Sequence, residues 1–146
     1  MKIPLAFLAD AAVAHPDGKL SALGCGIDCV NATQFPIQLG NLAVVVKVEF
    51  APVECERPHL IEVLPLDADG KPFSNALRQQ VTPSRNALDP TLPSAAQAIL
   101  NYVGLSFAGP SEYAFSVVVD GQEMASLPLR VIRAPALTGG IAPSAS

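Results

Sequence analysis

A chain of 146 residues has the size of one ordinary domain, which can bury a hydrophobic core without disulfides or metals. Half of its residues are apolar and only 15% are charged, yet no run of eighteen apolar residues occurs, so we expect no membrane span. The net charge is −4 and the nine Lys and Arg residues form no cluster, which argues against a nucleic-acid partner.

The N-terminal segment MKIPLAFLADAAVA resembles a signal peptide only in part. Residues 12–14 have the small side chains of a cleavage site, but the apolar stretch 3–9 is short, contains Pro4 and is closed by Asp10. Three cysteines are also too few for the disulfide framework of a secreted domain. We therefore expect a cytoplasmic protein whose first strand covers residues 3–13.

Strands joined by tight turns dominate the rest of the chain. Fourteen Pro and ten Gly leave no room for a long helix. Asp-Gly dipeptides at 17–18, 69–70 and 120–121 suit the positive φ angles of hairpin turns. Apolar and polar residues alternate around them, as in half-buried strands. The predicted strands are residues 3–13, 19–30, 42–51, 59–67, 72–81, 98–107, 112–120 and 123–132.

This pattern predicts one all-β domain over residues 1–133. Its fold class is an antiparallel two-sheet β-sandwich, immunoglobulin-like, with seven to eight strands. Tyr113 in the segment GPSEY is either a simple core aromatic or a tyrosine whose hydroxyl returns to upstream backbone, as in immunoglobulin-like sandwiches. Residues 31–41 are expected to connect strands, 82–96 to form a long Pro-rich loop, and 134–146 to form a flexible tail.

The segment GCGIDCV contains two of the three cysteines. On a strand, Cys25 and Cys29 would lie about 13 Å apart, too far for a disulfide or for one zinc ion. A helix would bring them together, but Gly24 and Gly26 argue against one. We therefore predict core thiols, and expect Cys55, near a loop, to be the most reactive of the three.

Other candidate chemistry is sparse. The segment DADG, residues 67–70, places two carboxylates on a turn but lacks the spacing of a calcium loop, so we interpret Asp67 as a turn residue. No nucleophile elbow and no phosphate-binding glycine pattern accompany His15 or His59. We predict no catalytic residue, no metal and no cofactor. A pocket that joined His59, Cys55 and a carboxylate would favour an enzyme instead.

The segment HLIEVLPLD is apolar on both faces. Leu60, Leu64 and Leu66 share one face, and the other contains Ile61, Val63 and Pro65. Only one face can serve the core, and Pro65 suggests an edge strand or a bulge. The candidate partner-contact residues are therefore Leu60, Leu64, Leu66 and Pro65.

Three stretches resemble a set of small bacterial proteins that is known only as a domain of unknown function. They are FLADAAVAHPDGKLSALGCG, RPHLIEVLPLDADGKP and GPSEYAFSVVVDGQEMASLPLRV, and the resemblance covers most of residues 2–132. It implies a small all-β cytoplasmic domain and assigns no activity and no site residue.

Together these observations favour a non-enzymatic interaction or assembly module with a protein partner or as a homo-oligomer. The alternative is a small-ligand or carbohydrate-binding β-sandwich, although the chain has no Trp and few other aromatic residues to stack on a sugar. A small enzyme is the third possibility.

Overall fold

The structure is a computed structural model, and it describes residues 1–135. The predicted tail from residue 136 onward lies outside the described residues. Within them, strands follow one another with a single 3₁₀ turn between. The elements are β1 (Lys2–Ala9), β2 (Ala11–Ala14), β3 (Leu20–Leu23), β4 (Cys29–Ala32), β5 (Ile37–Phe50), η1 (Pro52–Glu54), β6 (His59–Leu66), β7 (Leu77–Val81), β8 (Ser94–Phe107), β9 (Ser111–Val119) and β10 (Gln122–Arg133).

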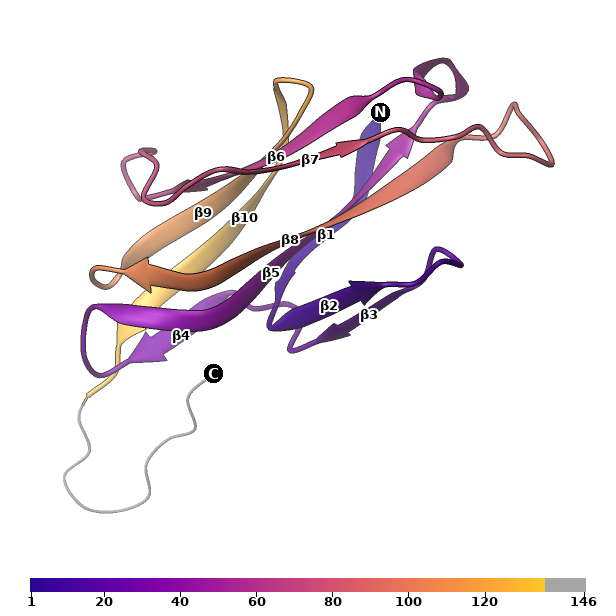
Figure 1. Cartoon of the computed structure of the whole chain (residues 1–146). Coiled ribbons are helices and arrows are strands. Elements are labelled where there is room, and N and C mark those ends of the chain that lie inside the picture. The colour runs from indigo at the N-terminus through magenta and orange to yellow at the C-terminus, as the bar shows by residue number, and fades with distance from the viewer. Residues whose placement is uncertain (136–146) are drawn as a thin grey trace.

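These strands form a three-stranded sheet, β1-β5-β8, a five-stranded sheet, β4-β10-β9-β6-β7, and a separate β2-β3 hairpin (Figure 1). The prediction of an all-β fold is confirmed. The purely antiparallel two-sheet arrangement is wrong in two respects: β4 runs parallel to β10, and the hairpin is a third small sheet. The predicted connection 31–41 is shorter than expected, because β4 continues to Ala32 and β5 already begins at Ile37. The segment between them crosses from the five-stranded to the three-stranded sheet.

All three Asp-Gly dipeptides lie in the predicted hairpin connections, between β2 and β3, β6 and β7, and β9 and β10. The last is a two-residue turn in which Asp120 and Gly121 have φ angles of 51° and 82°. Both central residues of such a turn need positive φ, which Gly adopts freely and Asp tolerates. Hairpins are therefore confirmed at all three places, but the other two have longer connections, of five residues between β2 and β3 and ten between β6 and β7, in which the Gly and not the Asp has a positive φ.

Two predicted strands are broken instead of continuous. The predicted strand 3–13 divides at Asp10 into β1 and β2, and the predicted strand 19–30 ends as β3 at Leu23 and resumes as β4. Gly24 stands at the second break with a positive φ, and a Cβ there would collide with the Asp10 carboxylate. The two breaks thus face each other, which explains why residues 1–135 form ten strands instead of the predicted seven to eight.

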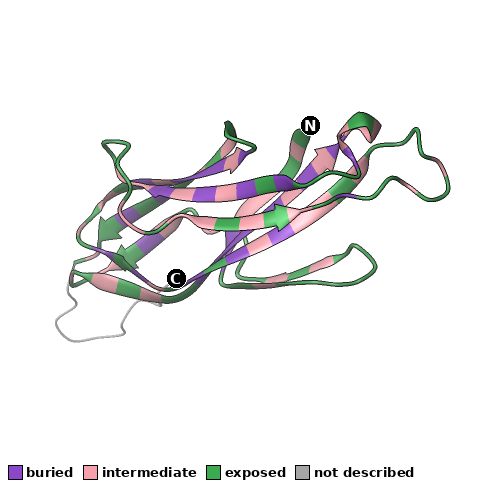
Figure 2. Ribbon diagram, turned by 45° about the horizontal axis from the view of Figure 1, so that its top comes forward, coloured by how far each residue is buried: buried purple, intermediate pink, exposed green. Residues whose placement is uncertain are grey.

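The central strand β5 is buried on both of its faces. Val44, Val46 and Val48 lie in the main core between the two larger sheets. Ala43 and Val45 point the other way and are covered by the β2-β3 hairpin, whose Leu20 packs against them. The buried stretches along β5 and its neighbours are visible in Figure 2.

Tyr113 in β9 fulfils both interpretations of the segment GPSEY. Its side chain is buried and its ring lies 4.8 Å from that of Phe107, measured between centroids. Its hydroxyl donates a hydrogen bond of 2.8 Å to the Gly109 carbonyl, four residues upstream. The tyrosine therefore contributes to the core and also closes the turn that precedes its own strand.

Replacing Tyr113 by Phe should remove this hydrogen bond and leave the Gly109 carbonyl without its partner. We expect the free energy of unfolding in urea to fall by about 1 kcal/mol. Tyr113→Leu, which also removes ring packing, should cost about 2–4 kcal/mol. Equal stability of wild type and Tyr113→Phe would show that the turn does not need the hydroxyl.

Candidate functional site

The apolar strand β6 lies inside the five-stranded sheet, between β9 and β7. The expectation that it is an edge strand is therefore wrong, because β7 covers its free side. Pro65 is buried on the core side together with Ile61 and Val63, so it cannot contact a partner directly. A proline fits here because the β6-β7 ladder has ended at Val63, and the Pro65 carbonyl accepts a hydrogen bond from the Phe73 N–H.

The three leucines of β6 point away from the core. Leu60 is 36% exposed, and Leu64 and Leu66 are half-buried. Small or apolar residues of β9 and β10 adjoin them, since Leu66 pairs with Ala114 and Ala114 pairs with Pro128. We call this surface the outer β6 face. Its residues are Leu60, Leu64, Leu66, Ala114, Val118 and Pro128.

Two ion pairs accompany the leucines of the outer β6 face. Glu62, between Leu60 and Leu64 on β6, accepts a hydrogen bond of 2.8 Å from Arg78 of β7. Glu112 of β9 accepts one of 2.9 Å from Arg130 of β10. The Glu123 carboxylate of β10 lies on the same side of the sheet, where it accepts a hydrogen bond of 2.7 Å from the hydroxyl of Ser116, the residue that pairs with Leu64.

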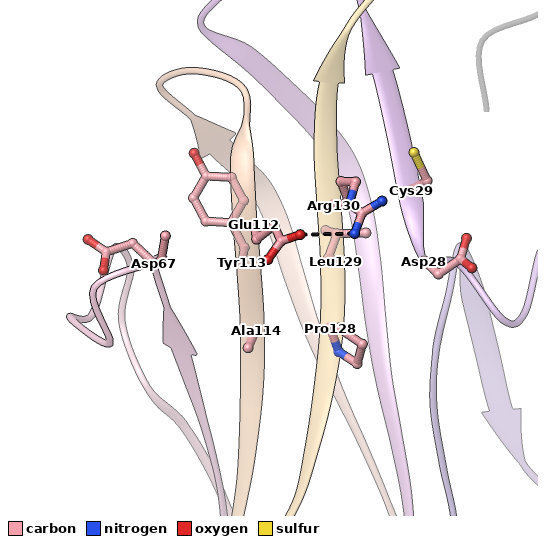
Figure 3. Close-up of a pocket in the computed structure, with 10 residues that line it drawn as sticks. Asp28, Cys29, Asp67, Glu112, Tyr113, Ala114, Pro128, Leu129 and Arg130 are labelled. Atoms are coloured by element: carbon pink, nitrogen blue, oxygen red, sulfur yellow. Dashed lines mark hydrogen bonds and ion pairs between the residues drawn. The ribbon is translucent and has the colours of Figure 1, made fainter.

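An open cavity of about 560 Å³ adjoins the second ion pair (Figure 3). The carboxylates of Asp28 and Asp67 line it together with Glu112. Asp67 Oδ1 already accepts hydrogen bonds from the N–H groups of Asp69 and Lys71, which confirms its interpretation as a turn residue. Among residues 1–135, no group of three His, Cys, Asp or Glu is placed to hold a metal ion.

The sequence did not single out this cavity. Its wall joins Arg130 to Cys29 across the parallel β4-β10 pair, which connects segments about a hundred residues apart. Neither segment has a pattern that predicts a parallel partner. The period-2 alternation places Glu112 and Arg130 on exposed faces, but it does not reveal the register that makes them neighbours.

The cysteine predictions are partly wrong. Cys25 is exposed, Cys29 is partly buried and Cys55 is buried. The chain leaves strand geometry after Leu23, so Cys25 and Cys29 do not share the face of one strand. Cys55 directly follows η1, which agrees with the predicted position near a loop. Its thiol is buried, however, and donates to the Ala51 carbonyl at 3.5 Å.

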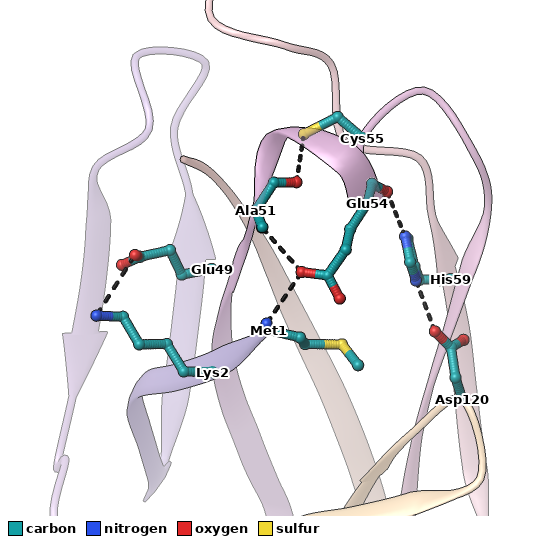
Figure 4. A network of polar contacts seen from close by, with 8 residues as sticks. All are labelled: Met1, Lys2, Glu49, Ala51, Glu54, Cys55, His59 and Asp120. Atoms are coloured by element: carbon teal, nitrogen blue, oxygen red, sulfur yellow. Dashed lines mark hydrogen bonds and ion pairs between the residues drawn. The ribbon is translucent and has the colours of Figure 1, made fainter. Parts of the chain in front are cut away.

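His59, at the start of β6, is a buried ionisable side chain within a network of polar contacts (Figure 4). It is 5% exposed. Its Nδ1 lies 2.6 Å from Asp120 Oδ2, and its Nε2 lies 2.6 Å from the Glu54 carbonyl oxygen. The thiol of Cys55 turns to Ala51 instead. The three groups that would favour an enzyme are neighbours, but both imidazole nitrogens are already engaged.

Opposing effects set the protonation of this pair. Burial alone would lower the pKa of His59, but the Glu54 carbonyl and the Asp120 carboxylate outweigh it and raise the pKa above 6.5. Burial would likewise raise the pKa of Asp120, but hydrogen bonds from His59 and from the Leu60 N–H lower it below 3.8. The geometry and the electrostatics both favour an imidazolium–carboxylate pair.

The described residues thus define an all-β protein with leucines on an outer sheet face and a partly buried ion pair at the β9-β10 turn. The sequence model of a family of unknown function, DUF6941, matches residues 4–132, and the chain belongs to this family. The predicted resemblance to a domain of unknown function is confirmed. Comparisons with curated proteins and with solved structures find no match. No helix among residues 1–135 is long and apolar enough to cross a membrane.

The His59–Asp120 pair should make stability depend on pH. Because the pKa of His59 is raised on folding, its contribution is complete below about pH 6.5 and is lost as pH rises through the folded pKa. The Asp120 contribution is present above about pH 3.8 and is lost as pH falls through its lowered pKa. We expect Asp120→Asn to reduce the free energy of unfolding by about 1 kcal/mol between these limits, since the carboxylate is partly exposed.

Urea unfolding of wild type and Asp120→Asn across pH 3–9 measures this difference. Asp17→Asn is the matched control, because Asp17 also precedes Gly in a hairpin turn and caps the Lys19 N–H but has no histidine partner. A wild-type-minus-variant difference that does not change with pH would contradict an ionised pair.

Thiol labelling should separate the three cysteines by burial. We expect a maleimide to react with Cys25 in the folded protein first and with Cys29 more slowly. Cys55 should react only when the chain opens. Cys25→Ser should remove the fastest phase and leave the others, as followed by mass spectrometry. Labelling of Cys55 as fast as that of Cys25 would show that η1 does not shield it.

Proposed function

We propose that the protein is a non-enzymatic interaction and assembly module that binds through the outer β6 face. The observation that supports this proposal is a strand from the interior of a sheet that directs Leu60, Leu64 and Leu66 away from the core. Isolated exposed apolar residues are ordinary, but apolar side chains that recur along one sheet face, here around the Glu62–Arg78 ion pair, are typical of surfaces covered by another chain.

The partner we propose is a second copy of the chain. The ion pairs Arg78–Glu62 and Arg130–Glu112 neutralise two carboxylates of this face, and the Glu123 carboxylate is hydrogen-bonded to the Ser116 hydroxyl. Two copies related by a two-fold axis can therefore meet with little like-charge repulsion if the axis keeps the two Glu123 side chains apart, and the same patch serves both copies.

We also propose that the fold is a variant of the immunoglobulin-like class. The order β1-β5-β8 opposite β10-β9-β6-β7 corresponds to the order of the two sheets in that class. The hydrogen bond from Tyr113 to Gly109 corresponds to its tyrosine corner. Three free thiols are compatible with a reducing cytoplasm as the location.

The carbohydrate-binding alternative gains no support from the aromatic residues. Both Tyr and all six Phe lie among the described residues, and none of the eight is exposed. Sugar-binding platforms present aromatic rings to solvent, and the described part of this chain does not.

Sedimentation velocity from micromolar to millimolar concentration tests the proposed assembly. We expect the wild type to sediment as a reversible dimer. Leu64→Lys should raise the dissociation constant at least tenfold, because a charge at the centre of the face must be desolvated on assembly. Circular dichroism should show that the variant keeps its β-structure.

Val103→Lys is the matched control, since Val103 is an apolar strand residue that is 82% exposed on the other large sheet. It should leave the dissociation constant unchanged. A wild-type monomer at every concentration would refute the second copy as partner. Equal effects of the two lysine variants would refute the outer β6 face as the contact.

A further inference from the structure

The segment 52–56 connects His59 to the long loop that follows β7. This loop, residues 82–93, contains neither strand nor helix. The N–H of Glu56 donates to the Pro83 carbonyl at 2.8 Å, and Glu56 Oε1 accepts the N–H of Arg85 at 2.9 Å. Arg85 Nε also donates to the Pro52 carbonyl at 3.2 Å. The contacts that hold residues 52–56 in place therefore also fix the base of the loop.

The loop presents an apolar side chain to solvent. Leu88 is 97% exposed, and its own N–H and that of Asp89 are held by the Asn86 side chain. The tip is therefore locally structured. The loop is attached to the 52–56 segment through Glu56 and Arg85, and to β8 through the Ser94 hydroxyl, which donates to the Ser84 carbonyl at 2.7 Å. Glu56 has a φ of 64°, an unfavourable conformation for a residue with a side chain, so its position must be maintained by the contacts around it.

His59 contacts this segment at the Glu54 carbonyl. It can donate to the Glu54 carbonyl and to Asp120 at the same time only when both ring nitrogens carry a proton. Its two nitrogens face a carboxylate oxygen and a carbonyl oxygen, and both of these atoms are acceptors. A neutral imidazole has one N–H, so it can satisfy one acceptor and must direct a lone pair at the other. The Phe50 ring, 4.5 Å away between centroids, also favours a cationic neighbour.

The charged groups around His59 decide which contact is lost first. Asp120 is on the β9-β10 turn, Arg57 precedes β6, and the Glu54 carboxylate is bound to the Ala51 N–H and to the Met1 ammonium of the β1 end. The thiol of Cys55 is engaged with Ala51. An anionic oxygen is a stronger acceptor than a carbonyl, so the remaining proton stays on Nδ1 beside Asp120. Deprotonation therefore breaks the Nε2 contact with Glu54.

We propose that His59 is a pH-operated latch. Its doubly protonated form ties residues 52–56 to the β9-β10 turn, and the loss of one proton releases the base of the loop that displays Leu88. The latch closes below the folded pKa of His59, which lies above the ordinary histidine value, and opens above it. Opening changes the position of the loop relative to the sandwich without unfolding the two large sheets. This inference does not depend on the proposed dimer.

Nuclear magnetic resonance of the whole chain tests the latch. A two-bond ¹H–¹⁵N correlation of the histidine rings, followed from pH 5.5 to 9.5, should show both His59 nitrogens protonated at neutral pH and only Nδ1 protonated at the alkaline end. His15, whose Nε2 contacts the Ser21 hydroxyl on the exposed hairpin, serves as an internal reference. A His59 ring with a single proton at pH 6 would overturn the proposal.

Amide hydrogen exchange in the same titration measures the release. Protection factors of the Glu56 and Arg85 amides should fall at least tenfold as His59 loses its proton. The amide of Gly70, which donates to the Asp67 carbonyl in another turn, should keep its protection factor. Unchanged protection of Glu56 and Arg85 across the His59 transition would refute the connection to the loop.

Asp120→Asn provides the decisive variant, because Asn tolerates the positive φ of this turn and can still accept the Leu60 N–H. Removing the carboxylate charge should shift both the His59 transition and the loss of Glu56 protection to lower pH by the same amount. His15→Gln should shift neither. If the variant moved the His59 transition but not the exchange transition, ring protonation and loop release would be independent and the latch would be refuted.

Discussion

The burial of both faces of β5 is the constraint on which the architecture depends. Burying a valine stabilises a protein by about 1.5–3 kcal/mol, and β5 places valines on both sides of its sheet. The main core covers one side. The other is covered by the β2-β3 hairpin, which as an isolated two-stranded element would be marginally stable. Strand and hairpin therefore depend on each other, and the chain must leave the sheet after β1 in order to form the cover.

The outer β6 face and the His59–Asp120 pair meet at one residue. Leu60 belongs to the face through its side chain, while its N–H donates to Asp120 Oδ1 and its carbonyl accepts the Asp120 N–H. Asp120 thus serves three purposes: it forms a turn at positive φ, fixes the start of β6 and is the counterion of His59. A single short side chain links the end of the core to the edge of the exposed surface.

Local patterns predict the hairpins, the outward direction of the β6 leucines and the central part of most strands. They miss the start of β5 at Ile37 and extend β7 too far toward the turn, since β7 begins only at Leu77. Local patterns do not predict the two strand breaks between residues 10 and 28, because apolar residues continue through both of them. The evidence for these breaks is long-range: the N–H of Gly26 donates to the Leu8 carbonyl, and Gly24 packs against Asp10. This is why Cys25 was wrongly placed in the core. His59 and Asp120 were each noticed, but their contact spans sixty-one residues and no local signal indicates it.

The parallel pairing of β4 with β10 has a consequence for how the chain folds. Arg133 pairs with Ala32, and Val131 with Val30, so this ladder closes a loop of about a hundred residues. Such a contact is entropically costly to form early, and folding rates fall as contacts of high sequence separation increase. During synthesis on a ribosome, β4 has no sheet to join until β10 has emerged from the exit tunnel. The β4 segment therefore stays unpaired, and one side of the nascent core stays exposed, until nearly the whole domain has been synthesised.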